Sequence, residues 1–344
     1  MATPASSYWR GPVKTEPDFS NLLAVLRHER PSRPTLFEFF MNEPLYRLMS
    51  GLGTDVTAAQ LRIAAFRAAG YDYVTHWGSS ISFPSGERAH GKSVSMDTGF
   101  VITDRNSFDA YNWPDPDAFD YSGIATEAKL LPNGMQFVVC GPCGVLENAV
   151  ALLGYSNLCL MLVDNPPLLQ DVFDAIGSRL VRHYEKALEF DAVGALIGND
   201  DWGFKTQPML SPDQMRHYVF PWHKRIVEAA HKAGKPAILH SCGNLASVMD
   251  DIISDMKYDG KHSYEDTIMP VEDAYEQYGR RIAILGGIDL DFVCRSTPDK
   301  VFARSTAMLE RAAQRGSFAL GTGNSVPEYV PVENYFAMIA AVKR

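Results

Sequence analysis

Residues 193–241 carry the pattern that decides the fold of this chain. They read VGALIGN (193–199), then the amphipathic stretch SPDQMRHYVFPWHKRIVEAAHKAG (211–234), then PAILHS (236–241). The first and third runs are short and apolar on both faces, which is typical of strands buried in a parallel sheet. The middle stretch has the length and the apolar spacing of a helix. Together they predict a strand, a helix and a second parallel strand.

The ends of the middle stretch carry helix-capping residues. Ser211 before Pro212 predicts the first turn, because serine caps free backbone amides and proline is tolerated at the first helical position. Gly234 predicts the end, since glycine adopts the left-handed conformation that closes helices. Pro221 falls inside the stretch and predicts a kink. Thr297, also followed by a proline, predicts another helix start of the same kind.

The same alternation runs through most of the chain. The predicted strands are 34–40 (PTLFEFF), 72–77 (DYVTHW), 135–141 (MQFVVCG), 193–199, 236–241, 260–265 (GKHSYE), 282–288 (IAILGGI) and 317–323 (SFALGTG). Eight strands, each followed by a helix, indicate an α/β fold of the closed (β/α)8 TIM barrel type. We expect one barrel domain over 21–344, an N-terminal arm over 1–20 that is flexible or draped, and a long loop at about 78–120 near the barrel mouth.

Composition excludes several classes of protein. Apolar residues make up 46% and charged residues 21%, an ordinary globular balance. A net charge of −9 without a basic cluster argues against nucleic acid as a partner. No apolar run is long enough to span a membrane, and the first residues do not read as a secretion signal, so we expect a cytoplasmic protein. Five cysteines fit reduced thiols better than a disulfide framework, and Cys140 of the Cys140-x-x-Cys143 pair is interpreted as a core residue rather than a redox or metal ligand.

Polar residues follow the predicted strands at their carboxyl ends. Because these ends meet at one rim of a barrel, where barrel enzymes place their active sites, we expect the side chains to converge there. The predicted substrate-binding residues are Asn42, His76, Trp77, Cys143, Asn199, Trp202, Asp289 and Asn324. His76 and Trp77 admit a second interpretation with equal weight, in which they close the top of the barrel.

His240 and Cys242 project to the same side just past a strand end. An imidazole and a thiolate at this spacing are good zinc donors, and Glu265, at the end of the next predicted strand, supplies an oxygen as a third ligand. The predicted metal ligands are therefore His240, Cys242 and Glu265. The alternative is a hydrogen-bonded core histidine beside an inert thiol.

Asp200 and Asp201 form an acidic pair after the fourth strand. One interpretation makes them a loop or helix cap. The other makes them catalytic, together with Glu265, as carboxylates that position or protonate substrate. Adjacent residues point in different directions, so each of the pair can have one of these roles.

Three blocks of the sequence resemble a known family: GNDDWGFKTQPMLSPDQMRHYVFPWHKRIVEAAHKAGKPAILHSCGNL (198–245), GGIDLDFV (286–293) and GTGNSVPEYVPVENY (321–335). They are similar to the uroporphyrinogen decarboxylase superfamily, and the likeness covers nearly the whole chain. The resemblance implies a (β/α)8 barrel, in agreement with the strand count. Within the superfamily, His240-Ser241-Cys242 resembles the His-x-Cys zinc motif of the cobalamin-dependent methyltransferases.

The chain departs from both branches of that family at defined positions. True uroporphyrinogen decarboxylases carry an Arg-Gln-Ala-Gly-Arg-Tyr block after the first strand, where this chain has FEFFMNEPLYRL (37–48). The methyltransferases that use His-x-Cys have a further, distant Cys, where this chain has Thr322 and Asn324. The first departure argues against porphyrinogen decarboxylation. The second argues against activation of a thiol and suits the subgroup that demethylates methyl ethers or methylamines.

The resemblance implies a methyltransferase that moves a methyl group from a small donor, a methoxylated aromatic by preference, to the reduced corrinoid of a separate carrier protein. Zinc would be the resident cofactor, and cobalamin would come with the carrier. The sequence alone contains nothing like the Asp-x-His-x-x-Gly segment that ligates cobalt in corrinoid carriers. Two alternatives stay open, a metal-independent decarboxylase or lyase, for which only Lys205 offers a cation near the rim, and a non-catalytic corrinoid- or metal-binding chaperone. A homodimer is also left open.

Overall fold

The structure, a computed structural model, describes residues 8–86 and 95–343. In these residues seven parallel strands form one sheet in sequence order, so every strand pairs with its neighbours along the chain. The strands are β1 (Tyr73–His76), β2 (Gln136–Cys140), β3 (Val193–Asn199), β4 (Ala237–His240), β5 (Gly260–His262), β6 (Ala283–Leu285) and β7 (Phe318–Ala319). Each lies within its predicted range, and nearly all of their residues are buried.

The first predicted strand, 34–40, joins the barrel through a single parallel bridge, Leu36 to Leu320. Leu320 accepts from the Phe37 amide and donates to the Thr35 carbonyl, both at 2.8 Å. On its other side the segment contacts β1 through a side chain, because the Glu38 amide donates a hydrogen bond to the Tyr73 hydroxyl at 2.7 Å. The segment is therefore the eighth member of a TIM barrel, although its pairing is too short to count as a strand.

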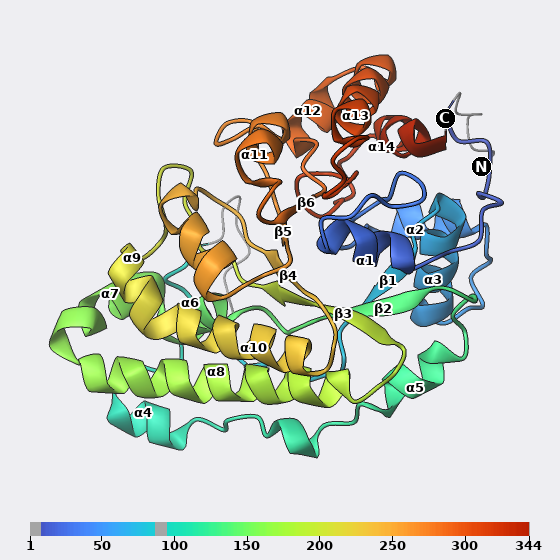
Figure 1. Ribbon diagram of the computed structural model, residues 1–344. Helices are drawn as coiled ribbons and strands as arrows, with labels where there is room; N and C mark the ends of the chain where they lie inside the picture. Colours follow the sequence, from blue (N-terminus) through green and yellow to red (C-terminus); the bar gives the residue numbers. More distant parts are fainter. Residues whose placement is uncertain (1–7, 87–94, 344) are drawn as a thin grey trace.

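Helices surround the strands (Figure 1). They are α1 (Ser20–Leu26), α2 (Glu43–Ser50), α3 (Ala58–Ala69), α4 (Arg105–Ala110), α5 (Ser122–Ala128), α6 (Val145–Leu153), α7 (Tyr155–Asp164), α8 (Pro166–Leu188), α9 (Pro212–Gln214), α10 (Phe220–Lys232), α11 (Val271–Tyr278), α12 (Leu290–Arg295), α13 (Pro298–Ala312) and α14 (Val332–Ala340). Short 3-10 or π turns occupy Pro116–Ala118, Met215–Val219, Ala246–Val248, Asp251–Asp255 and Ala341–Lys343. Across the described ranges no single helix is long and apolar enough to cross a membrane; only the bent pair α6 and α7, at 93°, passes that test together.

The predicted helix over 211–234 forms with an irregular first half. The Ser211 side chain accepts from the Gln214 amide, and the Gln214 side chain returns the bond, as a capping box does. A π turn follows, in which the Phe220 amide donates to Met215, and Pro221 then occupies the first turn of α10. Proline lacks an amide hydrogen, and the wider π turn stands directly before the helical turn that contains Pro221. Gly234 is left-handed with φ 71°.

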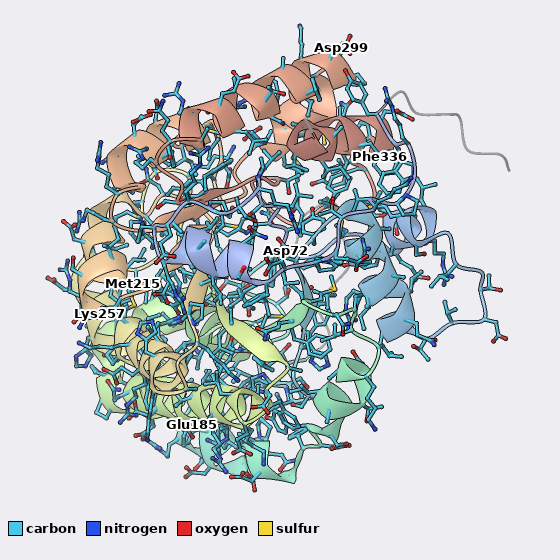
Figure 2. The ribbon with its side chains drawn as sticks, turned by 45° about the vertical axis from the view of Figure 1, so that its right-hand side comes forward. Asp72, Glu185, Met215, Lys257, Asp299 and Phe336 are labelled. Atoms are coloured by element: carbon cyan, nitrogen blue, oxygen red, sulfur yellow. The ribbon has the colours of Figure 1, made fainter. Side chains whose placement is uncertain are left out.

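The described part of the N-terminal arm is draped over the barrel. The Tyr8 hydroxyl bonds to Asp299 of α13, and Trp9 stacks on Phe336 of α14 with ring centroids 4.7 Å apart. Figure 2 labels Asp299 and Phe336 on these neighbouring helices, and Asp72 near the middle of the molecule. The Asp18 amide reaches Asp72 at 2.7 Å. The long loop at 78–120 contains α4 and one 3-10 turn, and its residues 87–94 lie outside the described part.

Candidate functional site

Asp201, His240 and Cys242 bring one carboxylate oxygen, one imidazole nitrogen and one sulfur within 4.8 Å of one another. His240 ends β4, and Cys242 lies two residues beyond it. Asp201 lies two residues beyond Asn199, the end of β3 and the register partner of His240. Parallel pairing of β3 with β4 therefore places the three groups at the same end of the barrel. We refer to them as the Asp201–His240–Cys242 cluster.

The loops around Cys242 hold its position by hydrogen bonds. Its amide donates to Asp201 Oδ1 at 2.9 Å, so the aspartate is fixed to the cysteine backbone. Asn324 Nδ2 donates to Cys242 Sγ at 3.3 Å, and Sγ lies 3.6 Å from Ser263 Oγ. Asn324, predicted from the sequence as a substrate-binding residue, thus contacts the sulfur of the cluster.

The donor set of the cluster fits a zinc ion. One imidazole, one thiolate and one carboxylate are three zinc ligands that leave a fourth tetrahedral position open. Burial and the charge of Asp201 raise the pKa of the Cys242 thiol to about 12. A bound cation would reverse this effect because it stabilises the thiolate. The half-buried carboxylate of Asp201 and thiol of Cys242 are thus arranged for a positive partner.

A chain of hydrogen bonds determines which nitrogen of His240 can bind a metal. His262 Nε2 lies 3.1 Å from the Thr322 carbonyl, and the two Nδ1 atoms of His240 and His262 lie 2.7 Å apart. Burial lowers the pKa of His262 to about 3 and that of His240 well below its usual range, so both rings are neutral. The carbonyl only accepts, so His262 carries its proton on Nε2 and accepts at Nδ1. His240 then carries its proton on Nδ1 and presents the lone pair of Nε2.

Glu38 lies at the other end of this chain and was missed in the sequence. Its carboxyl accepts from the Thr322 amide at 2.7 Å, and its second oxygen lies 2.8 Å from the Thr322 hydroxyl. Complete burial raises the pKa of Glu38 to about 8. The one available signal was a glutamate in the middle of the apolar strand PTLFEFF. Glu38 fixes Thr322, whose carbonyl orients His262.

Glu265 does not join the cluster, which corrects the predicted ligand set. The strand that was predicted to reach residue 265 ends at His262. Glu265 instead opens a turn in which its carbonyl accepts from the amides of Ile268 and Met269, at 2.9 and 2.8 Å. Its side chain lines a neighbouring pocket, and Asp201 contributes the carboxylate to His240 and Cys242.

The side chains of Asp200 and Asp201 point in different directions, as predicted for adjacent residues. Asp200 is fully buried, and its oxygens accept from the amides of Leu146 and Glu147, both at 2.9 Å. His223 Nε2 lies 3.0 Å from the same carboxylate. Asp200 therefore caps the N-terminus of α6, and Asp201 is the aspartate of the pair that belongs to the cluster. Glu147 was missed in the sequence; burial and the charges of the two aspartates raise its pKa to about 8.

Three other predicted site residues tie loops together at the carboxyl ends of the strands. Asn199 accepts from the Gly141 amide at 3.0 Å. Asn42 caps α2 through the Leu45 amide at 2.8 Å. Asp289 caps α12 through the Phe292 amide at 2.7 Å. These contacts hold loops of the rim in place, and contact of the three residues with a substrate stays a prediction.

The remaining predicted residues are His76, Trp77, Cys143 and Trp202; of these, Trp202 adjoins the cluster, since it follows Asp201 and its amide donates to Ser241 Oγ at 3.2 Å. His76 faces the helices, with its ring on Phe137 and its Nε2 3.4 Å from Glu127 of α5. Burial lowers its pKa to about 4. Trp77 is exposed with Arg62 5.2 Å above its ring. Trp202 is fully buried, its ring edge-on to His223 and Phe220 close by, and Cys143 is exposed.

An open pocket with about 530 Å³ of empty volume lies beside the cluster. It is lined by Gly243, Asn244, Leu245, Ala246, Met249, Lys261, Ser263, Tyr264, Glu265, Ile268, Met269 and Tyr278. We call it the β4–β5 pocket, after the two strands whose following loops form it. Ser263, which contacts Cys242 Sγ, belongs to its wall.

Comparison with known proteins identifies the family. A sequence model of the family uroporphyrinogen decarboxylase (URO-D) matches residues 124–344, well over half of the chain. The chain belongs to this family. Uroporphyrinogen decarboxylases from Anaeromyxobacter dehalogenans strain 2CP-C and Anaeromyxobacter sp. strain Fw109-5 are each 23% identical over 301 residues, 83% of this chain and 84% of theirs. A methyltransferase from Methanosarcina mazei has a similar fold, with a TM-score of 0.71 and 17% identity over 94% of this chain and 97% of that one.

Proposed function

We propose that this member of the uroporphyrinogen decarboxylase family is a corrinoid-dependent methyltransferase. It would move a methyl group from a small donor, by preference a methoxylated aromatic, to the reduced corrinoid of a separate carrier protein. The observation that carries the proposal is the Asp201–His240–Cys242 cluster, a zinc donor set at the carboxyl ends of the strands. A solved structure of similar fold bears the name methyltransferase, which is in keeping with this choice.

Decarboxylation is the second candidate, because the curated relatives are named uroporphyrinogen decarboxylases. That reaction needs cations to hold a polycarboxylate substrate. The segment after the first strand has Arg47 in place of an arginine-rich block, and Arg47 pairs with Glu43 within α2 at 2.6 Å. It is therefore engaged on a helix rather than held out for a substrate, and the methyltransferase is the better supported function.

Each residue of the cluster has a distinct part in holding zinc. His240 would bind through Nε2, because Nδ1 is committed to His262. Cys242 would bind as the thiolate, with the Asn324 amide stabilising charge on the sulfur. Asp201 would bind through an oxygen while its Oδ1 holds the Cys242 amide. When bound, zinc supplies Lewis acidity toward the oxygen of the methyl donor, which is otherwise a poor leaving group.

The carrier protein has to bring its corrinoid to the same end of the barrel. The cluster lies beyond the carboxyl ends of β3 and β4, so the reacting methyl group would be approached from the loops after these strands. A docking contact of this kind needs to form and release in each cycle, which favours a small, transient interface. The carrier is therefore proposed to dock over the barrel mouth.

The experiment combines zinc-loaded protein, cob(I)alamin and 2-methoxyphenol, a methoxylated aromatic without a carboxylate, and follows formation of methylcobalamin by absorbance. Methylation that depends on the protein and disappears in Cys242→Ala supports the proposal. Cys159→Ala, on α7, is the matched control and should keep activity. The second candidate, decarboxylation, would be supported instead by two results together. The protein would release CO2 from uroporphyrinogen, and it would not methylate cobalamin from a methoxylated aromatic or from a methylamine.

A further inference from the structure

Lys261 carries a buried positive charge without a carboxylate partner. The residue is only 3% exposed. It lies on β5 between Gly260 and His262, and His262 faces the barrel interior, so Lys261 points to the opposite side, toward the helices. Its Nζ donates to the Ser263 carbonyl at 2.7 Å and, less closely, to that of Ser241 at 3.4 Å.

A buried ammonium normally has an anionic partner, because removal from water penalises the charge. No carboxylate lies within 4.0 Å of Lys261 among the ion pairs of residues 8–86 and 95–343. Burial lowers the pKa of Lys261 to about 8, against the opposing effects of Cys242, Asp201 and Glu265, none of which forms an ion pair with it. The ring of Tyr264, with its centroid 4.4 Å from Nζ, provides partial compensation by a cation–π contact.

Tyr264 supplies an independent observation at the same place. It is 7% exposed, and within the described part of the chain its hydroxyl has no hydrogen-bond partner. A buried hydroxyl without a partner is costly, and such groups in native proteins often mark a ligand or an ordered water. Both Lys261 and Tyr264 line the β4–β5 pocket.

The other residues of the pocket wall indicate what kind of group a ligand would carry beside its anionic group. Leu245, Met249, Ile268 and Met269 make most of it apolar. Glu265, also part of the wall, is partly exposed and would repel a second negative charge. The pocket therefore suits an apolar body with a single anionic group.

We propose that the β4–β5 pocket binds a small monocarboxylate, with the carboxylate on Lys261 Nζ and Tyr264 Oη and the apolar body against Leu245 and Met249. The pocket is formed by the loops after β4 and β5 and shares no lining residue with the Asp201–His240–Cys242 cluster, so it is a separate site beside the cluster. It does not depend on the proposed methyl transfer. Ser263 belongs to the pocket wall and contacts Cys242 Sγ, so an occupied pocket adjoins the cluster.

The test is calorimetric titration of the full chain with benzoate and with benzamide, its neutral analogue. We expect benzoate to bind with one site per chain and benzamide to bind at least about tenfold more weakly, because a charge-assisted hydrogen bond is lost. Terephthalate should also bind more weakly than benzoate, because its second carboxylate meets Glu265. This comparison of ligands needs no variant and is independent of folding defects.

Two variants locate the site. Lys261→Met keeps the length of the side chain without its charge, and we expect it to lose benzoate binding by about tenfold or more. Tyr264→Phe should weaken binding by a smaller factor, and Lys232→Met, on the exposed surface of α10, should leave it unchanged. Thermal melting confirms that each variant is folded.

Metal removal separates the pocket from the cluster. Benzoate should bind equally to zinc-loaded and chelator-treated protein, since Lys261 and not a metal holds it. Binding that disappears with the metal and survives Lys261→Met would place the carboxylate on the cluster and overturn the proposal. Absence of benzoate binding to the wild type, or equal affinity for benzamide, would overturn it as well.

Discussion

Replacement of His262 by phenylalanine should weaken zinc binding without a direct ligand being touched. In the wild type His262 accepts the Nδ1 proton of His240 across 2.7 Å, and this bond leaves Nε2 of His240 free for a metal. Phenylalanine cannot accept the proton. His240 must then keep a buried donor without a partner or move its proton to Nε2, where it blocks the metal.

The size of the effect follows from these two choices. A buried donor left without a partner costs roughly 1–3 kcal/mol. Loss of an outer-shell partner typically lowers metal affinity by roughly 10–100-fold, which corresponds to about 1.4–2.7 kcal/mol. The two figures agree, so we expect the zinc dissociation constant of His262→Phe to rise by about 10–100-fold. His262→Gln offers an oxygen acceptor and should recover part of the loss.

The assay is competition for zinc against a chromophoric chelator, with melting curves to show that each variant is folded. His183→Phe is a matched control, because His183 is also a buried histidine but bonds to Tyr121 instead of the cluster. It should alter stability and leave zinc affinity unchanged. A folded His262→Phe protein with wild-type zinc affinity would refute the tautomer argument.

Three more predictions test the ligand set and its support. Cys242→Ala should lower zinc content to below one per chain by metal analysis while the barrel stays folded, and Cys159→Ala should keep the metal. Asp201→Asn should weaken zinc binding whereas Glu265→Gln should not; the reverse result would restore the ligand set predicted from the sequence. Glu38 retains its proton in the fold up to about pH 8 but loses it near 4.5 in the unfolded chain, so the wild type should lose stability as pH rises between these values. Glu38→Gln keeps an acceptor for the Thr322 amide and a donor for its hydroxyl, so denaturant titrations of this variant should show a shallower decline over that range; an unchanged decline would contradict the assignment.

The barrel could be predicted from the sequence because each strand and helix is specified by residues that are close together in the chain. Each strand is a short apolar run between turn residues, and the helix caps at Ser211 and Thr297 are decided by side chains within three residues of the helix start. The exception, the segment 34–40, shows where local information ends. Its apolar pattern correctly predicts a member of the barrel. On the side that faces β1, however, a hydrogen bond to the Tyr73 side chain replaces backbone pairing.

Within the site, His240 and Cys242 could be predicted from the sequence, because a two-residue spacing at a strand end puts both side chains on one side. The third member depended on distances that no local pattern contains. Glu265 was predicted because the strand was expected to end at residue 265, but β5 ends three residues earlier, at His262. Asp201 reaches the cluster because β3 pairs with β4 in the observed register.

Only the tertiary structure brought Glu38 to Thr322, 284 positions away in the chain, and His262 to His240. Such partners come together when the barrel closes. The metal-binding atom of His240 and the unpaired charge of Lys261 are therefore properties of the closed barrel, although every residue concerned is visible in the sequence.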